Sequence, residues 1–153
     1  MTLPTLLTIG YEDAELGAFL ATLHAAGVTL LVDTRERAQS RRRGYSKTAL
    51  ELALKDPGIG YRHLRALGTP PAIRKAYKLD RDFAALKAGY AIHLATQGAA
   101  LDELGALAAR ERVVLLCYEA NPATCHRSLI AGRLQELGLV GAVEDLAPPR
   151  RKG

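Results

Sequence analysis

Residues 117–127, CYEANPATCHR, bring together the side chains best suited to chemistry in this sequence. We expect a strand to end at Cys117, a loop to follow, and Cys125 and His126 to lie in or near the first turn of the next helix. Backbone N–H groups at a helix N-terminus stabilise a thiolate or a bound anion. Arg127 adds a fork-shaped donor that suits phosphate or carboxylate. These residues could form a nucleophile or an anion pocket, unless Cys125 only fills space and Arg127 only forms an internal salt bridge.

The same segment could hold a metal ion. Cys117, Cys125 and His126, with His63 added, offer sulfur and nitrogen ligands of the kind that zinc binds. However, the seven-residue gap between the cysteines matches no common zinc module, and adjacent Cys and His side chains rarely face one ion together. We therefore predict no metal site and no cofactor.

Acidic and basic side chains also follow other expected strands. Asp33 and Arg35 lie two residues apart, so their side chains begin on the same face. Asp33 could act as a base or orient Arg35, or the two could form a structural ion pair that holds the following loop. Glu12 and Glu119 would lie at the same edge, and His63 could reach it. Carboxylates that converge with arginines favour perturbed pKa values and acid–base chemistry.

An arginine-rich loop at residues 35–47 carries the positive charge of the chain. It holds six of the 21 basic residues and one acidic residue, so its charge equals the net charge of +5 of the whole sequence. Such a local positive field attracts phosphates, nucleic acid or small anions. Guanidiniums beside an aromatic ring, as in SRRRGYS at residues 40–46, suit a nucleic-acid backbone with a stacked base, or a polyphosphate. The alternative is a solvated loop without a ligand.

The order of the expected elements places these residues on one fold. Strand-like runs lie at residues 5–9, 29–33, 59–64, 113–118 and 142–146. Helical spacing occupies most of the segments between them, with Asp13 expected to cap the first helix and Ser46 the second. This alternation predicts a single three-layer α/β domain, Rossmann-like in the loose sense, with a mostly parallel sheet of about five strands and helices on both faces. The domain would cover residues 1–147, followed by a basic tail at residues 148–153 that we expect to fray.

In a parallel α/β fold, ligands bind beyond the carboxyl ends of the strands. The polar clusters at residues 10–12, 33–35 and 117–119 should therefore meet along one edge of the sheet. The candidate catalytic residues are Cys117, Cys125, His126, Asp33 and Glu119. The candidate substrate-binding residues are Tyr11, Arg35, Ser40, Arg41, Arg42, Tyr45, His63 and Arg127.

Composition places the chain among ordinary globular proteins. Its 153 residues are 48% hydrophobic and 24% charged, which suits one domain with a real core. No apolar run approaches the roughly 18 residues that a membrane span needs. The first residues, MTLP, lack the basic start of a signal peptide, and two cysteines without such a signal favour free thiols over a disulfide scaffold. We therefore expect a cytoplasmic protein that does not bind membranes, while the sequence does not indicate its oligomeric state.

Several of these motifs occur in the order found in a known family. They are TIGY at residues 8–11, Asp33-x-Arg35, SRR at 40–42, YS at 45–46, Tyr61-x-His63, LG at 67–68, LCYE at 116–119 and CHR at 125–127. The set resembles the domain of unknown function 488 family of small bacterial and archaeal proteins, over about residues 8–143. The resemblance implies a compact, cytoplasmic α/β domain whose site combines the Asp-x-Arg and Cys-His-Arg segments, and it implies no particular reaction. Glu12 replaces a usual Ser and Ala38 a common Pro, which could change the charge of the pocket and loosen the basic loop.

A fainter similarity relates residues 31–35 and 113–138 to rhodanese-like domains, in which loop amides cradle a Cys at a strand end. The loop here is longer and lacks the glycines of a rhodanese loop. Our favoured hypothesis is an enzyme that acts on a phosphorylated or otherwise anionic substrate, such as a nucleotide or nucleic acid. One alternative is a rhodanese-like sulfur carrier that uses Cys117. The other is a non-catalytic module that binds nucleic acid or a partner through the loop at residues 35–47.

Overall fold

Apolar runs form the middle of the sheet, as the sequence predicts. In the computed structural model, which describes residues 2–151, β1 (Leu6–Gly10), β2 (Leu30–Asp33) and β4 (Val113–Cys117) are buried along their full length. Strands of this kind are typical of parallel sheets that are covered on both faces. β3 (Gly60–His63) and β5 (Val143–Leu146) are only partly buried and form the two edges.

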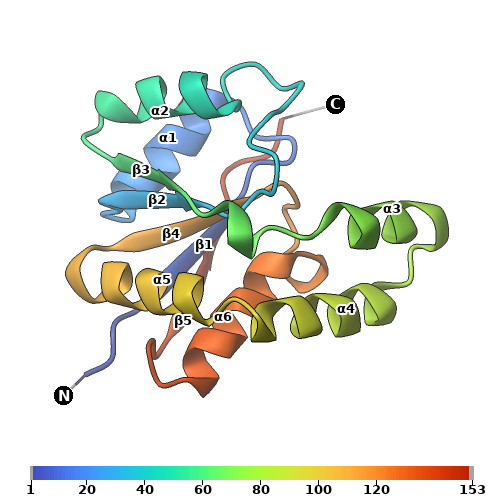
Figure 1. Ribbon diagram of the computed structural model, residues 1–153. Helices are drawn as coiled ribbons and strands as arrows, with labels where there is room; N and C mark the ends of the chain where they lie inside the picture. The colour runs from blue at the N-terminus through green and yellow to red at the C-terminus, as the bar shows by residue number, and fades with distance from the viewer. Residues whose placement is uncertain (1, 152–153) are drawn as a thin grey trace.

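The five strands form one parallel sheet in the order β3-β2-β4-β1-β5 (Figure 1). α1 (Leu16–Ala25) and α2 (Lys47–Lys55) cover one face. α4 (Phe83–Ala95), α5 (Gly98–Arg110) and α6 (His126–Glu136) cover the other. The predicted three-layer α/β domain with a parallel sheet of five strands is therefore confirmed.

Each face of the sheet has its own apolar core. Successive residues of β4 point to opposite faces, so Leu115 and Leu116 belong to different clusters. Leu115 lies in the cluster that contains Tyr90 of α4, and Leu116 in the one that contains Phe19 of α1 and Leu50 of α2. All five side chains are fully buried. The two cores fix the sheet between its helical layers and so hold the carboxyl ends of its strands in place.

α3 (Pro71–Asp80) lies outside these two layers. It contains no fully buried residue and packs mainly on α4, with which it forms a hairpin that projects from one side of the domain (Figure 1). The ring of Tyr77 meets the ring of Phe83 edge-on, with centroids 6.3 Å apart. The helix is therefore attached through one side, and its other side chains are free to face the loop after β2.

Two short 3-10 helices occur in the connections. η1 (Arg65–Leu67) follows β3, and η2 (Pro122–Thr124) lies in the loop between β4 and α6. Within residues 2–151, no helix has the length and apolar character required to cross a membrane.

The first loop and the C-terminal tail differ from expectation. Asp13 does not cap α1: its backbone has a φ of 57°, and the helix begins at Leu16 after Glu15. The carboxylate of Asp13 accepts a hydrogen bond from Arg150 at 2.6 Å instead. An isolated bridge also joins Ala14 to Arg150. This part of the tail therefore packs against the first loop rather than fraying, because the carboxylate that was expected to cap the helix pairs with it.

Leu115→Ala should lower the free energy of unfolding by about 2–5 kcal/mol, because it leaves a cavity in the core beneath α4, α5 and α6. Leu79→Ala is a matched control, since the Leu79 side chain is 89% exposed and its loss should cost less than about 0.5 kcal/mol. Urea unfolding of both variants provides the measurement. Equal losses would contradict the core assigned to this face of the sheet.

Candidate functional site

The carboxyl ends of β1, β2 and β4 meet at one edge of the sheet. Tyr11 donates its backbone N–H to the carbonyl of Cys117 at 3.3 Å, and Thr34 donates its own to the carbonyl of Leu116 at 3.2 Å. The segments that follow the three strands are therefore neighbours in space, although they lie far apart in the sequence.

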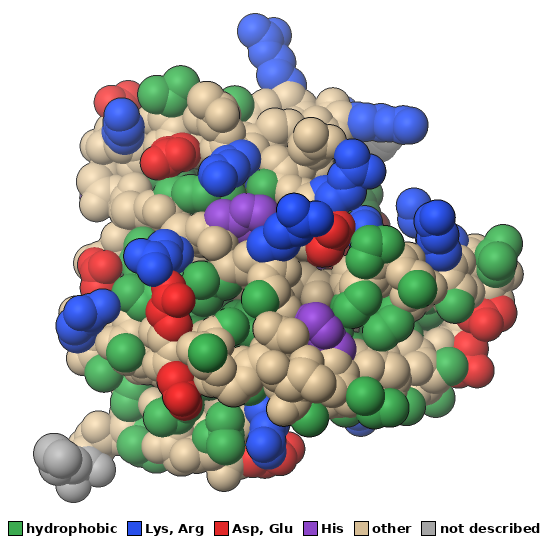
Figure 2. Space-filling model, in the orientation of Figure 1, with side chains coloured by type: hydrophobic (Ala, Val, Ile, Leu, Met, Phe, Trp, Pro, Cys, Tyr) green, Lys and Arg blue, Asp and Glu red, His purple; other side chains and the backbone are tan. Residues whose placement is uncertain are grey.

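A pocket with a volume of about 420 Å³ opens at this edge. Several residues singled out by the sequence line it: Tyr11, Arg35, Glu119 and His126. Its opposite wall is formed by α3 and the residue after it, which contribute the cations Arg74, Lys78 and Arg81. Figure 2 shows Lys and Arg side chains gathered on this face of the molecule, where the loop after β2 approaches α3. The pocket therefore joins the predicted edge of the sheet to a basic helix that lies outside it.

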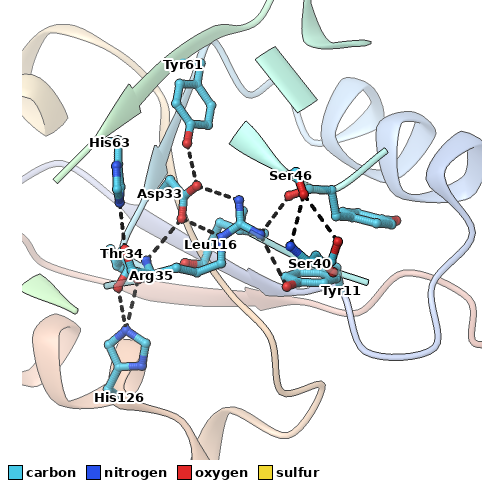
Figure 3. Close-up of polar contacts among 11 residues, drawn as sticks. Tyr11, Asp33, Thr34, Arg35, Ser40, Ser46, Tyr61, His63, Leu116 and His126 are labelled. Atoms are coloured by element: carbon cyan, nitrogen blue, oxygen red, sulfur yellow. Dashed lines mark hydrogen bonds and ion pairs between the residues drawn. The ribbon is translucent and has the colours of Figure 1, made fainter. Parts of the chain in front are cut away.

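A buried ion pair anchors the loop after β2 (Figure 3). Arg35 Nε and Nη2 donate to the two carboxylate oxygens of Asp33 at 2.9 and 2.7 Å. The hydroxyl of Tyr61 donates to the same carboxylate at 2.5 Å. Arg35 Nη1 donates to the carbonyl of Tyr45 at 2.7 Å and to the hydroxyl of Tyr11 at 3.3 Å. Asp33 is fully buried and Arg35 is 7% exposed, so the protein itself satisfies both groups.

These hydrogen bonds determine the protonation of Arg35 and Tyr61. Burial alone would lower the pKa of Arg35, but the hydrogen bonds and charge of Asp33 raise it above its ordinary value, so the guanidinium stays charged. Burial, followed by the bond to Asp33, raises the pKa of Tyr61, which therefore keeps the proton that it donates. The geometry supports the structural alternative left open by the sequence, in which Asp33 and Arg35 hold the loop. Arg35 lines the pocket, but its guanidinium is bonded to Asp33, Tyr45 and Tyr11.

Arg127 forms a second internal clamp. It is fully buried, and its Nε donates to Thr8 Oγ1 at 3.2 Å. Nη1 donates to Cys117 Sγ at 3.0 Å and to the carbonyl of Glu119 at 2.5 Å, and Nη2 donates to the carbonyl of Ala120 at 3.2 Å. Arg127 therefore fastens the loop after β4 to the sheet, but through uncharged acceptors and not through the internal salt bridge that was the structural alternative.

Gly10 lets this loop lie directly over the end of β1. A Cβ atom on Gly10 would come within 1.8 Å of the carbonyl oxygen of Glu119 and 2.5 Å of Arg127 Nη1. No side chain fits there, because both neighbours are held by the hydrogen bonds of the Arg127 clamp. The glycine is thus required by close packing of backbone on backbone.

His126 begins α6 and faces the loop after β2. Its Nε2 lies 2.8 Å from the carbonyl of Thr34, so this nitrogen carries the proton and donates it (Figure 3). Nδ1 lies 3.7 Å from Cys125 Sγ. Burial, the largest influence, lowers the pKa of His126 to about 4. The imidazole is therefore neutral near pH 7, and Nδ1 presents a lone pair to the sulfur.

The two cysteines are joined. A disulfide links Cys117 to Cys125, and both residues are 1% exposed. The expectation of two free thiols is therefore wrong for this structure. The cause is the loop at residues 118–124, which folds through η2 and brings the start of α6 back to the end of β4. Neither cysteine lines the pocket, although their neighbours Tyr118 and Thr124 do.

Tyr45 and His63 support the edge of the sheet from inside. The ring of Tyr45 is buried and stacks on the ring of Tyr11, with centroids 4.5 Å apart, and its hydroxyl donates to the carbonyl of Ala14 at 3.0 Å. His63 Nε2 lies 2.7 Å from the carbonyl of Arg35. Both residues thus fix the path of the loop after β2.

Ser40, Arg41 and Arg42 lie apart from this pocket. Ser40 Oγ accepts the backbone N–H of Arg42 at 3.0 Å, and Arg42 Nη2 donates to the carbonyl of Ala14 at 2.8 Å. Arg41, Arg42 and Arg43 line a second hollow of about 560 Å³. The arginine-rich loop therefore divides: its first residues border the pocket at the edge of the sheet, and residues 41–43 border the other hollow.

The cations of α3 were missed by sequence reasoning. Arg74, Lys78 and Arg81 are separated by four and three residues, so their shared helix face was a readable signal. The sequence does not show that this face turns toward the loop after β2. Glu36 makes the connection, because its carboxylate accepts from Arg74 Nη2 at 2.9 Å and from Arg65 Nη2 at 3.0 Å.

The fold and the pocket together define the class: a three-layer parallel α/β domain with a basic pocket at the carboxyl edge of its sheet. The model of the family described as domain of unknown function DUF488 matches residues 15–134, which is most of the chain. The chain belongs to this family, as its motifs indicate. No curated protein and no solved structure matches it.

Asp33→Asn should lower the free energy of unfolding by about 3–5 kcal/mol, because it leaves Arg35 as a buried cation without its counter-ion. Chemical denaturation measures the loss. Glu136→Gln makes the same change of acid to amide in the exposed pair with Arg133, and should cost less than about 1 kcal/mol. If the two losses were alike, the Asp33–Arg35 pair could not be what anchors the loop.

Gly10→Ala should destabilise the fold by more than about 2 kcal/mol, because the new methyl group must displace the Glu119 carbonyl and the Arg127 guanidinium. Gly132→Ala in α6 is the matched control: a Cβ there has no neighbour within 4 Å, and alanine is the better helix former. Thermal unfolding of both variants separates the two cases. A harmless Gly10→Ala would show that the loop does not lie on the end of β1.

Proposed function

We propose that this protein binds a phosphorylated or otherwise anionic ligand in the pocket between the loop after β2 and α3. The observation that carries the proposal is the convergence of cations from two distant segments: Arg37 from the loop, and Arg74, Lys78 and Arg81 from α3 and its end. Guanidinium groups bind phosphate and carboxylate with paired, charge-assisted hydrogen bonds. A pocket at the carboxyl edge of a parallel sheet is also where α/β folds bind their ligands.

The charges in the pocket are available to a ligand. Within residues 2–151, Arg37, Lys78 and Arg81 form no salt bridge, in contrast to the buried Arg35. Arg74 is held by Glu36, but its Nε is buried and has no hydrogen-bond partner among the described residues. A buried donor without a partner costs free energy, and an anion in the pocket would supply an acceptor for it.

Aromatic rings narrow the chemistry of the ligand. Tyr11, Tyr77 and Tyr118 line the same pocket as the cations. Aromatic side chains beside guanidinium groups suit a ligand that combines phosphate with a planar ring, because bases stack on aromatic faces. A nucleotide, or the end of a nucleic-acid strand, meets both requirements.

Glu119 is the group in the pocket best placed to exchange a proton with such a ligand. It lines the pocket, and its carboxylate forms no salt bridge within the described residues. A thiol nucleophile is less well supported, because Cys117 and Cys125 are buried, bonded to each other and absent from the lining of the pocket. The same facts weigh against the rhodanese-like alternative, which needs a sulfur on Cys117 that is open to a donor.

Lys78→Gln combined with Arg81→Gln should weaken the binding of adenosine monophosphate or pyrophosphate at least about tenfold, because each lost contact to a charged group is worth on the order of 1.5–3 kcal/mol. Both side chains are exposed, so the fold should be unaffected. Isothermal titration calorimetry at two salt concentrations measures the affinity and its dependence on charge.

Arg41→Gln combined with Arg43→Gln is the matched control, since it removes the same charge from the second hollow. This control should bind as tightly as the unchanged protein. Loss of binding in the control alone would move the ligand to residues 41–43, as the nucleic-acid module predicts. The proposal fails if neither probe binds the unchanged protein.

A further inference from the structure

We propose that this chain, once Cys117 and Cys125 are reduced, binds one thiophilic divalent cation such as Zn²⁺ through Cys117 Sγ, Cys125 Sγ and His126 Nδ1. One donor atom from each of these residues lies within 4.8 Å of the others. Two thiolates and one imidazole are a donor set that zinc binds in proteins. The site shares His126 with the lining of the proposed anion pocket but uses none of its cations, so different variants test the two proposals.

His126 is oriented as a metal ligand. The carbonyl of Thr34 holds its Nε2–H at 2.8 Å, which leaves Nδ1 unprotonated and directed at Cys125 Sγ, 3.7 Å away. A backbone carbonyl on the other ring nitrogen is the usual outer partner of a metal-bound histidine. The sequence alone did not predict this site, because neighbouring Cys and His side chains rarely face one ion. Here their donor atoms lie 3.7 Å apart, because Cys125 is extended, with φ −122° and ψ 147°, and His126 is the first residue of the helix.

The surroundings of the two sulfurs favour thiolates. Arg127 Nη1 lies 3.0 Å from Cys117 Sγ, and Cys125 immediately precedes the first turn of α6. A guanidinium and a helix N-terminus each stabilise a negative sulfur.

Reduction must come first, because the structure joins the sulfurs. A small dithiol such as dithiothreitol supplies two electrons and two protons: the S–S bond breaks, two thiols form, and the dithiol closes to its own cyclic disulfide. Binding of the cation then releases both thiol protons and forms two metal–sulfur bonds and one metal–nitrogen bond. The disulfide and the bound cation are therefore alternative states of one site.

Cobalt(II) is the probe that tests this site, because its thiolate complexes absorb strongly in the near ultraviolet. The reduced chain, freed of dithiol under nitrogen, is titrated with Co²⁺. We expect a single ion per chain with thiolate-to-cobalt absorption, and none for the disulfide form. Cys117→Ser and Cys125→Ser should each abolish the band of a two-thiolate site and weaken binding at least about tenfold. His24→Gln, which changes an exposed histidine of α1, is the control and should bind as before.

The proposal is overturned if the reduced chain gives no thiolate absorption, or if a serine variant keeps the affinity of the unchanged protein. A fall in affinity in His24→Gln alone would assign the ion to the surface and also overturn it. X-ray absorption of the zinc-loaded, unchanged protein decides the case if the serine variants do not fold. Two sulfurs and at least one nitrogen or oxygen around zinc are the expected shell, and a shell without sulfur contradicts the site.

Discussion

The buried ion pair between Asp33 and Arg35 is the interaction on which the site depends. Burying two charges is unfavourable unless every donor and acceptor is satisfied, and here Tyr61, Tyr11 and the carbonyl of Tyr45 complete the set. The pair fixes the start of the loop after β2, directly before Glu36. Glu36 in turn holds Arg74, so a short series of charges connects the sheet to a helix that has little apolar attachment of its own. The two walls of the pocket are positioned by this series.

Two groups of arginines around the pocket have opposite roles. Arg35 and Arg127 are buried, and each is surrounded by oxygen or sulfur acceptors from two or more elements, so they determine where the loops lie. The cations on α3 and Arg37 are exposed or border open space, and they give the pocket its charge. Because the buried arginines hold the loops, the exposed cations are not needed for that role and can bind a ligand. The loop after β4 contributes to both proposed sites. It carries Tyr118 and Glu119 to the anion pocket, and its two ends are joined by Cys117 and Cys125.

The order of apolar residues along the chain was enough to predict the sheet. The runs in β1, β2 and β4 are apolar on both faces, which is typical of strands in a parallel sheet covered by helices on both sides. The same reasoning predicted that Asp33 and Arg35 would lie on one face of a strand. It left their role open, because the Asp33 carboxylate also accepts a hydrogen bond from Tyr61, which lies 28 residues away in the sequence. The α3 cations, the disulfide and the pairing of Asp13 with Arg150 were not predicted. Each depends on where a loop or a chain end returns to the domain, and that path is set by tertiary contacts that no local spacing encodes.

Binding of an anion in the pocket between the loop after β2 and α3 is the property on which the proposed function depends. The arginine Nε–Hε NMR signals, followed during titration with adenosine monophosphate, test it most directly, because Arg74 Nε is buried without a partner in the described part of the chain. We expect large, saturating shifts for Arg74, Arg37 and Arg81, with Arg41 and Arg43 unchanged. Shifts confined to Arg41 and Arg43, or no saturation at any arginine, would contradict it.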